Sequence, residues 1–549
     1  MAAATTGKVM PAGSVSTASE LDRLLSWFEM HGGRVTKLCL QDLGEEMSLS
    51  LLAEQALTKG DVVMSIPISL CMTTKTAAAS ELGAVLEANP ELMDTPDEVL
   101  ALHLMAERIK GEGSFWKHYL RTLPDDVDTP LQWLVEGAEE EFQLLDGTMV
   151  GLLSKMMHSQ VVKDWEDIHL PLAEAHPEVL GRVTLEDYLW ALSSIWSRSF
   201  DYVGPGPDGA GSIRHRAMVP VINAANHDPS AAASLSEVIE FQASEEGGTP
   251  VGTGERGPMS PVEGIGPRGR LRVIAGRDYA AREQFFILYG RYSNAKLLYS
   301  YGFVLADNPY GCLDYWVRVP PADPAFAWKQ ALLAGNPLTA KQAYDFSGTV
   351  RRGGWVSPAL LATARVAQLT SDERPAAKNA FEGKIVSPRN EAASLRALIA
   401  GLRRKLASLG GAAGRGEGGG SVNTGLSPAS GAGVAADEGA ATVAALEAEL
   451  ERLVQQRQQQ RNDQVEGEGE GKGVRRVGDD QEGDGADSNA AAAMKSIRRK
   501  VAALRVRGEE RDVATEAIAA LEASLRRLQL AASVGFAAIA SFETLDSGN

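Results

Sequence analysis

The chain has 549 residues, 44% of them hydrophobic and 23% charged, and its formal net charge is −18 at pH 7. This length exceeds what one hydrophobic core usually holds, so we expect at least two domains. The acidity argues against DNA or RNA as a partner, because phosphate repels it. No apolar run in the sequence is long enough to predict a membrane span.

The first half of the chain changes from a polar tail to strand and then to helix. Residues 1–20 are rich in Ala, Ser and Thr and predict a flexible tail, whereas Leu21–Met30 has helical spacing. Val62–Pro67 is typical of a strand that follows a turn. From about 75 to 199 the pattern is mostly helical, with prolines between the segments.

Strand character returns in three segments, Val238–Phe241, Leu271–Ile274 and Phe285–Leu288. The Gly/Pro-rich stretch 247–269 between the first two has almost no apolar content and predicts a disordered loop. These segments favour a mixed domain over 21–313.

After Val319 the hydrophobic spacing is helical to the end of the chain, which predicts an all-α domain over 314–549. Low-complexity stretches at about 410–433 and 464–493 predict loops between its helices, and their interruptions favour a bundle over a coiled coil. The basic run Arg498–Lys500, with Arg505 and Arg507, is typical of a solvated helix face rather than a nucleic-acid patch.

The three cysteines, Cys39, Cys71 and Cys312, lie far apart and form no CxxC pair. We therefore expect no disulfide framework and no cysteine zinc site, and the eight histidines also lack metal-ligand spacing. We expect no metal and an intracellular, reducing compartment; the choice between cytoplasm, nucleus and chloroplast stays open.

Two segments carry polar residues in unusual places. In the first, an apolar run from Met218 ends in Asn226-His227-Asp228-Pro229; taken alone, this pattern indicates a strand and an Asn/Asp turn, or a ligand held by Asn226 and His227. In the second, Ile287–Val304, a strand ends in Tyr-Gly, a Ser-Asn pair caps a short helix, and the helix ends in Tyr-Gly-Phe. Taken alone, such tyrosines are typical of core or interface aromatics.

Together the two segments resemble the SET-domain methyltransferases of the Rubisco large-subunit lysine methyltransferase class. That class carries P-x-x-D-x-x-N-H and then Y-G-x-x-S-N…Y-G-F, matched here by Pro220…His227 and Tyr289…Phe303. Further stretches match the family's other motifs: Ser48–Ala53 with Ile66-Pro67, Ser114–Pro124, Leu145–Thr148, Trp190–Phe200 and, more weakly, Pro388–Glu391 and Arg498–Glu509.

The resemblance implies an α+β fold: a SET domain of short β-strands with a helical insertion, followed by an all-α substrate-binding domain. It implies S-adenosyl-L-methionine as cofactor and a protein substrate that presents a lysine, and we expect a monomer. Tyr289 would be the catalytic hydroxyl and Tyr301 a second aromatic wall. Arg198, Tyr202 and Asn223 would line the substrate channel. The residues expected to contact the cofactor are Met47, Ser48, Leu49, Arg198, Asn226 and His227.

Four positions depart from the family pattern. Ser48 and Ser50 replace glycines that allow close approach of the backbone to a ligand. Asn223 replaces the aspartate of P-x-x-D-x-x-N-H, and Arg282 replaces the glycine of a turn expected at the surface. These departures keep two alternatives open: methyl transfer to a histidine or an N-terminal amine, and a SET-fold peptide-binding scaffold with little activity.

Overall fold

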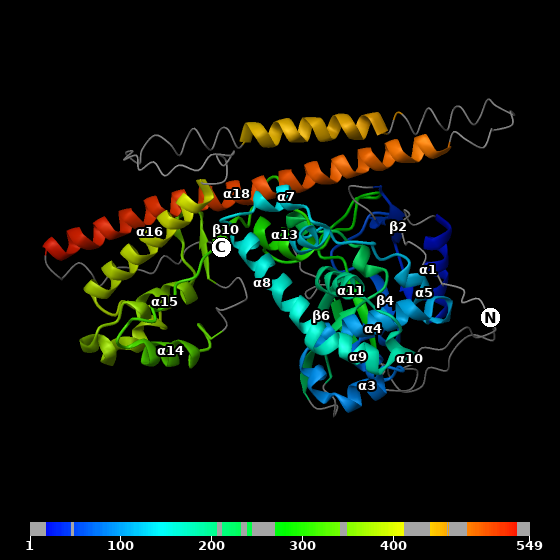
Figure 1. The fold of residues 1–549 in the computed structure, drawn as a ribbon, viewed down its shortest axis with the longest axis horizontal. Helices are drawn as coiled ribbons and strands as arrows, with labels where there is room; N and C mark the ends of the chain where they lie inside the picture. Colours follow the sequence, from blue (N-terminus) through cyan, green and yellow to red (C-terminus); the bar gives the residue numbers. More distant parts are fainter. Residues whose placement is uncertain are drawn as a thin grey trace, which may run out of the picture. The chain divides into compact units, whose positions relative to one another are not determined.

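The computed structural model describes residues 18–44, 49–205, 211–231, 239–243, 269–340, 348–410, 440–457, 459 and 480–534 (Figure 1). The chain divides into two compact units. The first comprises Met1–Gln132 and Met157–Arg291, and the second comprises Trp133–Met156 and Tyr292–Asn549.

The unit boundary differs from the predicted boundary at 313/314. The chain passes into the second unit at Tyr292, and 133–156, expected inside the helical insertion of the first domain, belongs to the second unit as well. Packing explains this, because Trp133, Phe142 and Leu145 share one buried core with Leu298 and Val506. Periodicity in the sequence marks these residues as apolar but does not say which core they join.

Among the described residues of the first unit, short antiparallel strands form three sheets. The largest has the order β1-β4-β9-β8, and a second has the order β5-β7-β6, whereas β2 pairs only with β3. The strand bounds are β1 Arg34–Val35, β2 Leu38–Asp42, β3 Leu49–Ala53, β4 Val62–Pro67, β5 Met72–Thr73, β6 Ser199–Pro205, β7 Ser212–Met218, β8 Ile239–Ala243 and β9 Gly269–Ile274.

Strand β4 has the predicted bounds and forms the centre of the largest sheet. Its residues Val63, Met64 and Ile66 are fully buried, and Ile66 pairs with Leu271 of β9. A run of apolar, partly β-branched residues therefore lies in the core of this unit.

Helices occupy 74–198 and cover these sheets. Helix α11 packs along α4 (Figure 1). Its first turn is fixed by a capping box in which Thr184 Oγ1 accepts from Asp187 N at 3.2 Å. The helix bounds are α1 Ala18–Met30, α2 Thr74–Ala78, α3 Gly83–Ala88, α4 Pro96–Lys110, α5 Lys117–Leu120, α6 Pro130–Glu136, α7 Glu139–Gln143, α8 Met149–Asp164, α9 Leu170–Ala175, α10 Pro177–Leu180 and α11 Leu185–Arg198.

The strand predicted at Phe285–Leu288 is wrong in detail, because the segment forms only isolated bridges. Phe285 N donates to Leu51 O at 2.7 Å, whereas Ile287 N donates to Asn226 O at 2.9 Å. Since Phe285 and Ile287, two residues apart, bond to two different segments, no continuous ladder forms.

The second unit is mostly helical, and it adds a two-stranded sheet to the predicted all-α domain. In that sheet β10 pairs antiparallel with β11, and α16 and α18 lie side by side (Figure 1). The bounds are α13 Asn294–Tyr301, β10 Cys312–Asp314, α14 Phe326–Ala334, β11 Thr349–Arg351, α15 Pro358–Ala367, α16 Pro388–Gly410 and α18 Asp480–Val534.

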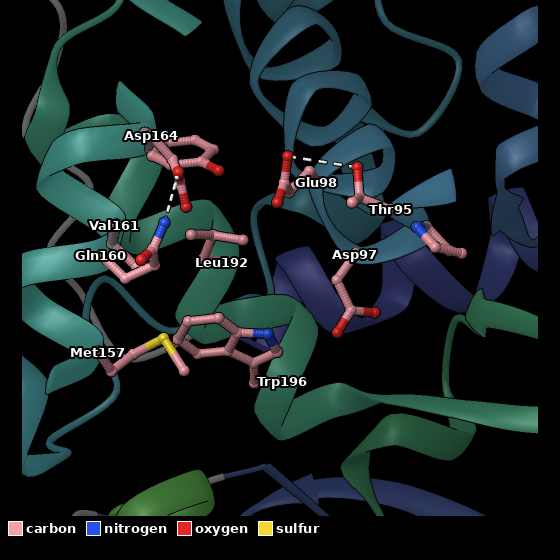
Figure 2. Close-up of a pocket in the computed structure, with 11 residues that line it drawn as sticks. Thr95, Asp97, Glu98, Met157, Gln160, Val161, Asp164, Leu192 and Trp196 are labelled. Carbon is pink, nitrogen blue, oxygen red and sulfur yellow. Dashed lines mark hydrogen bonds between the residues drawn. The ribbon is translucent and has the colours of Figure 1, made fainter. Parts of the chain in front are cut away.

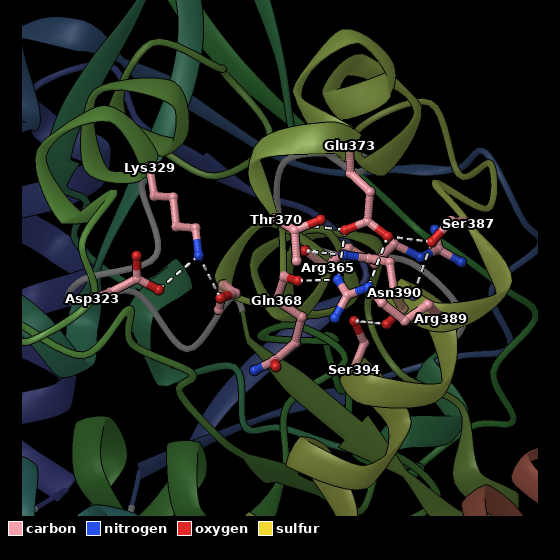
Figure 3. Close-up of polar contacts among 11 residues, drawn as sticks. Asp323, Lys329, Arg365, Gln368, Thr370, Glu373, Ser387, Arg389, Asn390 and Ser394 are labelled. Atoms are coloured by element: carbon pink, nitrogen blue, oxygen red, sulfur yellow. Dashed lines mark hydrogen bonds and ion pairs between the residues drawn. The ribbon is translucent and has the colours of Figure 1, made fainter.

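Buried ion pairs tie the helices of the second unit together. Arg365 on α15 donates to the Glu391 carboxylate on α16 at 2.7 and 2.9 Å, and the Arg365 side chain is only 5% exposed. Lys329, 3% exposed on α14, donates to Asp323 at 2.7 Å and to Ala367 O at 2.9 Å (Figure 3). Both of these buried cations therefore have a carboxylate beside them.

The loop predicted over 464–493 is corrected at its C-terminal side, because α18 already begins at Asp480. Alanines near 490 favour helix once the following turns pack. The first 17 residues of the predicted tail 1–20, nearly all of the predicted loop 247–269 and residues 411–433 of the predicted loop 410–433 lie outside the described residues. Residues 18–20 belong to α1, so the tail is corrected there. None of the helices in the described ranges combines the length and apolar character needed to cross a bilayer.

Candidate functional site

The two motif segments meet in the first unit. Ile287 N donates to Asn226 O at 2.9 Å and Asp228 N donates to Ile287 O at 3.2 Å, so that His227 and Ile287 form a parallel bridge. Residues 60 positions apart in the sequence thus become neighbours through backbone contacts alone.

Tyr289 makes the most specific contacts between the segments. Its backbone amide donates to His227 Nδ1 at 3.0 Å, and its hydroxyl donates to Ala225 O at 3.1 Å. Burial raises the pKa of the Tyr289 phenol, although the Arg198 guanidinium opposes the rise. The phenol therefore keeps its proton at neutral pH and acts as a hydrogen-bond donor, not as a base.

His227 lies against Tyr289, with ring centroids 5.2 Å apart and planes tilted by 36°. Its Nδ1 accepts the Tyr289 amide, so the proton of the neutral ring is assigned to Nε2. Burial lowers the pKa of the imidazole below its ordinary value of 6.5. The ring is therefore neutral at pH 7.

Arg198 and Asn223 lie together on the other side of this segment. Arg198, the last residue of α11, donates from Nη1 to Asn223 O at 3.2 Å. The Asn223 side chain donates from Nδ2 to the Tyr119 hydroxyl at 2.9 Å. Tyr119 is fully buried, and burial raises the pKa of its phenol, so both groups of this pair are uncharged.

The backbone before Asn223 is strained. Val221 has φ 71° and ψ −54°, and Ile222 N donates to Pro220 O at 2.9 Å, which is the rare three-residue turn with positive φ. A β-branched residue pays for this conformation with about 1–3 kcal/mol. Such strain is typical of functional sites, where the backbone must hold side chains in a fixed orientation.

Ser50 lies at the other end of the site, on β3. It is fully buried, and its Oγ accepts from Asn226 Nδ2 at 2.9 Å and from Gln284 Nε2 at 3.0 Å. The serine that replaces a family glycine therefore contacts the side chain predicted to hold the cofactor. Leu49 begins the same strand, whereas Met47 and Ser48 lie outside the described residues.

Two predicted substrate residues are separated from this cluster in different ways. Tyr202 on β6 stacks on His215 at 5.2 Å and on Phe241 at 6.4 Å between ring centroids. Tyr301 ends α13 in the second unit, where it stacks on Tyr292 at 6.3 Å. Its expected role beside Tyr289 stays a prediction.

Sequence reasoning left two side chains out of the site, Tyr119 and Gln284. Tyr119 lies inside a matched motif, S-x-W-x-x-Y, and that match was the available signal. No signal in the sequence pointed to Gln284, because its contact with Ser50 joins residues 234 positions apart.

A separate hollow of about 350 Å³ lies between α4, α8 and α11 (Figure 2). None of the predicted site residues lines it, and its acidic groups are already engaged. Asp97 accepts from Arg216 at 2.9 Å and Asp164 accepts from Gln160 at 2.8 Å. Within the described ranges, no group of three or more His, Cys, Asp or Glu side chains is placed to hold a metal ion.

Comparison with known proteins identifies the fold. Residues 320–413 match the family model "Rubisco LSMT substrate-binding". An actin-histidine N-methyltransferase from Callithrix jacchus is 25% identical over 357 residues, which covers 64% of this chain and 53% of that protein. The chain thus spans about half the length of this relative.

Two solved structures share the architecture. The SET domain of LSMT bound to lysine and AdoHcy superimposes with a TM-score of 0.60 at 18% identity, over 94% of this chain and 93% of that chain. Rubisco LSMT bound to AdoMet gives a TM-score of 0.56 at 18% identity, over 94% of this chain and 97% of that chain. The chain therefore has the fold of these Rubisco LSMT structures, and its residues 320–413 are similar to the substrate-binding family model.

Proposed function

We propose that this chain is an S-adenosylmethionine-dependent protein N-methyltransferase. The observation that carries the proposal is the double contact of Tyr289, from its hydroxyl to Ala225 O at 3.1 Å and from its amide to His227 Nδ1 at 3.0 Å. This contact joins the two motifs into one site. Relatives named as actin-histidine N-methyltransferases, and a solved structure of the same fold bound to AdoMet, support the reaction class.

Arg198 supplies the test of whether these residues fit the cofactor. Its Nε is buried and has no hydrogen-bond partner among the described residues, a costly state that an acceptor on a ligand would relieve. A guanidinium there suits the carboxylate of S-adenosylmethionine. Asn226 and the backbone at Leu49 would hold the rest of the cofactor. When bound, the cofactor supplies a methyl group on a positively charged sulfur.

The chain's own residues then orient the acceptor and exclude water. The Tyr289 phenol stays protonated at neutral pH, so it donates a hydrogen bond and does not remove a proton from the acceptor. Buried Tyr119 adds apolar ring surface beside Asn223. Positioning of a neutral nitrogen in such a site is the main contribution a protein makes to this displacement.

For the acceptor, we propose the imidazole of a histidine. Asn223 and Tyr119 form an uncharged pair where the family motif has an aspartate. An imidazole, with pKa about 6.5, is neutral near pH 7, whereas a lysine, with pKa about 10.4, must lose a proton first. The uncharged pair of Asn223 and Tyr119 offers no carboxylate that could stabilise a lysine ammonium. The actin-histidine specificity named for the relatives agrees with this choice.

Lysine is the second candidate. The sequence resemblance predicts it, and a solved structure of this fold is bound to lysine. The Asn223→Asp variant separates the two acceptors, because a carboxylate there favours the cationic lysine. We expect the ratio of lysine to histidine methylation to rise about tenfold or more, a change of about 1.4 kcal/mol.

Two measurements test the proposal. Calorimetry of the full chain with S-adenosylmethionine must show binding; no affinity refutes the enzyme and leaves the scaffold alternative. Methyl transfer is then measured by mass spectrometry on purified actin and on two matched peptides, one with a histidine and one with a lysine at the acceptor position. Tyr289→Phe should retain cofactor binding and lose most transfer, whereas the control Tyr310→Phe should retain both.

A further inference from the structure

The second unit contains a hollow of about 830 Å³ that none of the predicted site residues lines. Its walls come from α8, from the segment after β10, and from α16. All of these residues belong to the second unit. We infer that this hollow binds an extended segment of a partner protein that carries an apolar side chain flanked by carboxylates.

The floor of the hollow is apolar and exposed. Leu152 and Met156 lie four residues apart on α8, so they share one face of the helix, and they are 49% and 41% exposed. Tyr315 and Trp316 form the facing aromatic wall. Large apolar side chains that gather in a concavity are typical of protein-binding surfaces, and the flexible thioether of Met156 adapts to an inserted side chain.

The rim of the hollow is cationic. The charged residues that line the hollow are Asp146, Lys155, Arg318 and Lys405. Lys155 pairs with Asp146 at 3.0 Å, and Lys405 pairs with buried Glu510 at 2.8 Å. Arg318 is exposed and has no hydrogen bond or ion pair with any residue that the structure describes. Because Lys155 and Lys405 are each paired with a carboxylate, the exposed Arg318 guanidinium is the charge that a partner meets, and it favours a carboxylate on that partner.

The arrangement favours a peptide segment over a small anion. Two of the three cationic side chains are already paired with carboxylates, and the start of α8 offers little to an anion. There, Met149 N already donates to Glu510 at 3.0 Å and Gly151 N donates to Thr148 Oγ1 at 3.1 Å. The apolar floor therefore favours an apolar side chain of the partner, and the charged residues that line the hollow favour acidic residues beside that side chain.

The inference rests on the proposed function in one respect, because a protein methyltransferase must hold a protein substrate. It adds a contact made by the second unit, of which residues 320–413 match the substrate-binding family model. Its test does not require turnover, so its failure is distinguishable from failure of the methyltransferase proposal.

The experiment measures binding of fluorescein-labelled twelve-residue peptides to the full chain by fluorescence anisotropy. One peptide carries two leucines four residues apart between aspartates, a second has lysines in place of the aspartates, and a third has serines in place of the leucines. We expect only the first to bind well. Inorganic phosphate should not compete at equal ionic strength.

Two variants localise the binding. Arg318→Glu and Leu152→Ser should each weaken binding of the first peptide about tenfold, a loss of about 1.4 kcal/mol. Both side chains are exposed, so neither change should lower the melting temperature. Lys163→Glu is the matched control, because Lys163 is also an exposed cation on α8 but lies outside the hollow. Equal binding of the three peptides, or unchanged binding by both variants, overturns the inference.

Discussion

Glu509 on α18 makes the stability of the second unit depend on pH. Burial raises the pKa of its carboxyl from an ordinary 4.5 to about 7, with nearby Glu510 adding to the rise. Asn294 N donates to its carboxylate at 3.1 Å and, with the Cys312 amide and Arg352, opposes the rise only in part. The folded protein therefore keeps a proton on Glu509 at pH values where the unfolded chain has released it.

The sign and the magnitude follow from these two pKa values. Below pH 4.5 both states are protonated and Glu509 costs nothing. Between 4.5 and 7 only the folded state holds the proton, so the free energy of unfolding falls as pH rises. Above 7 the cost is constant. A pKa raised from 4.5 to about 7 corresponds to about 3 kcal/mol, at about 1.4 kcal/mol per pKa unit.

Glu509→Gln removes this cost, since the amide is neutral at every pH and still accepts the Asn294 N–H. Urea denaturation followed by circular dichroism, with amide exchange of β10 to report on the second unit, compares the variant with the parent from pH 4.5 to 8. The variant should match the parent at pH 4.5 and gain about 3 kcal/mol at pH 8. Glu522→Gln, a control on the same helix, should add no such pH dependence. A constant difference between Glu509→Gln and the parent would refute the reasoning.

Three further predictions concern the site and its support. Ser50→Ala removes the acceptor shared by the Asn226 and Gln284 amides, so urea denaturation should show a loss of about 1–3 kcal/mol and calorimetry a weaker affinity for S-adenosylmethionine; unchanged affinity would remove Ser50 from the site. Arg282→Gly should stabilise the fold by about 1 kcal/mol, because Arg282 has φ 70° in an exposed turn; an equal or lower stability contradicts strain there. Arg365→Leu leaves the Glu391 carboxylate buried without its partner and should cost about 3–5 kcal/mol, whereas the double variant with Glu391→Leu should recover most of the loss; additive losses would contradict the pairing.

Much of the site was predictable because its residues occur in two ordered motifs. The resemblance carried by Pro220–His227 and Tyr289–Phe303 pointed to Tyr289, Asn226 and His227, and in the structure Tyr289 contacts His227 while the Asn226 backbone accepts from Ile287. The departures were also visible in the sequence as serine, asparagine or arginine in place of the expected residue. Their physical consequences were not, because each consequence depends on a neighbour that is distant in the chain.

The sequence by itself determined the strand Val62–Pro67 and the helical character of about 75–199, since these follow from local periodicity, and its two motifs carry the resemblance that implied the α+β class. Only the tertiary structure decided that Ser50 contacts Asn226, that Asn223 pairs with Tyr119, and that 133–156 joins the core of the second unit. It also decided that 285–288 bonds to two segments instead of one strand. Hydrogen bonds and core packing select partners by proximity in space, and proximity between distant residues is set by the whole fold.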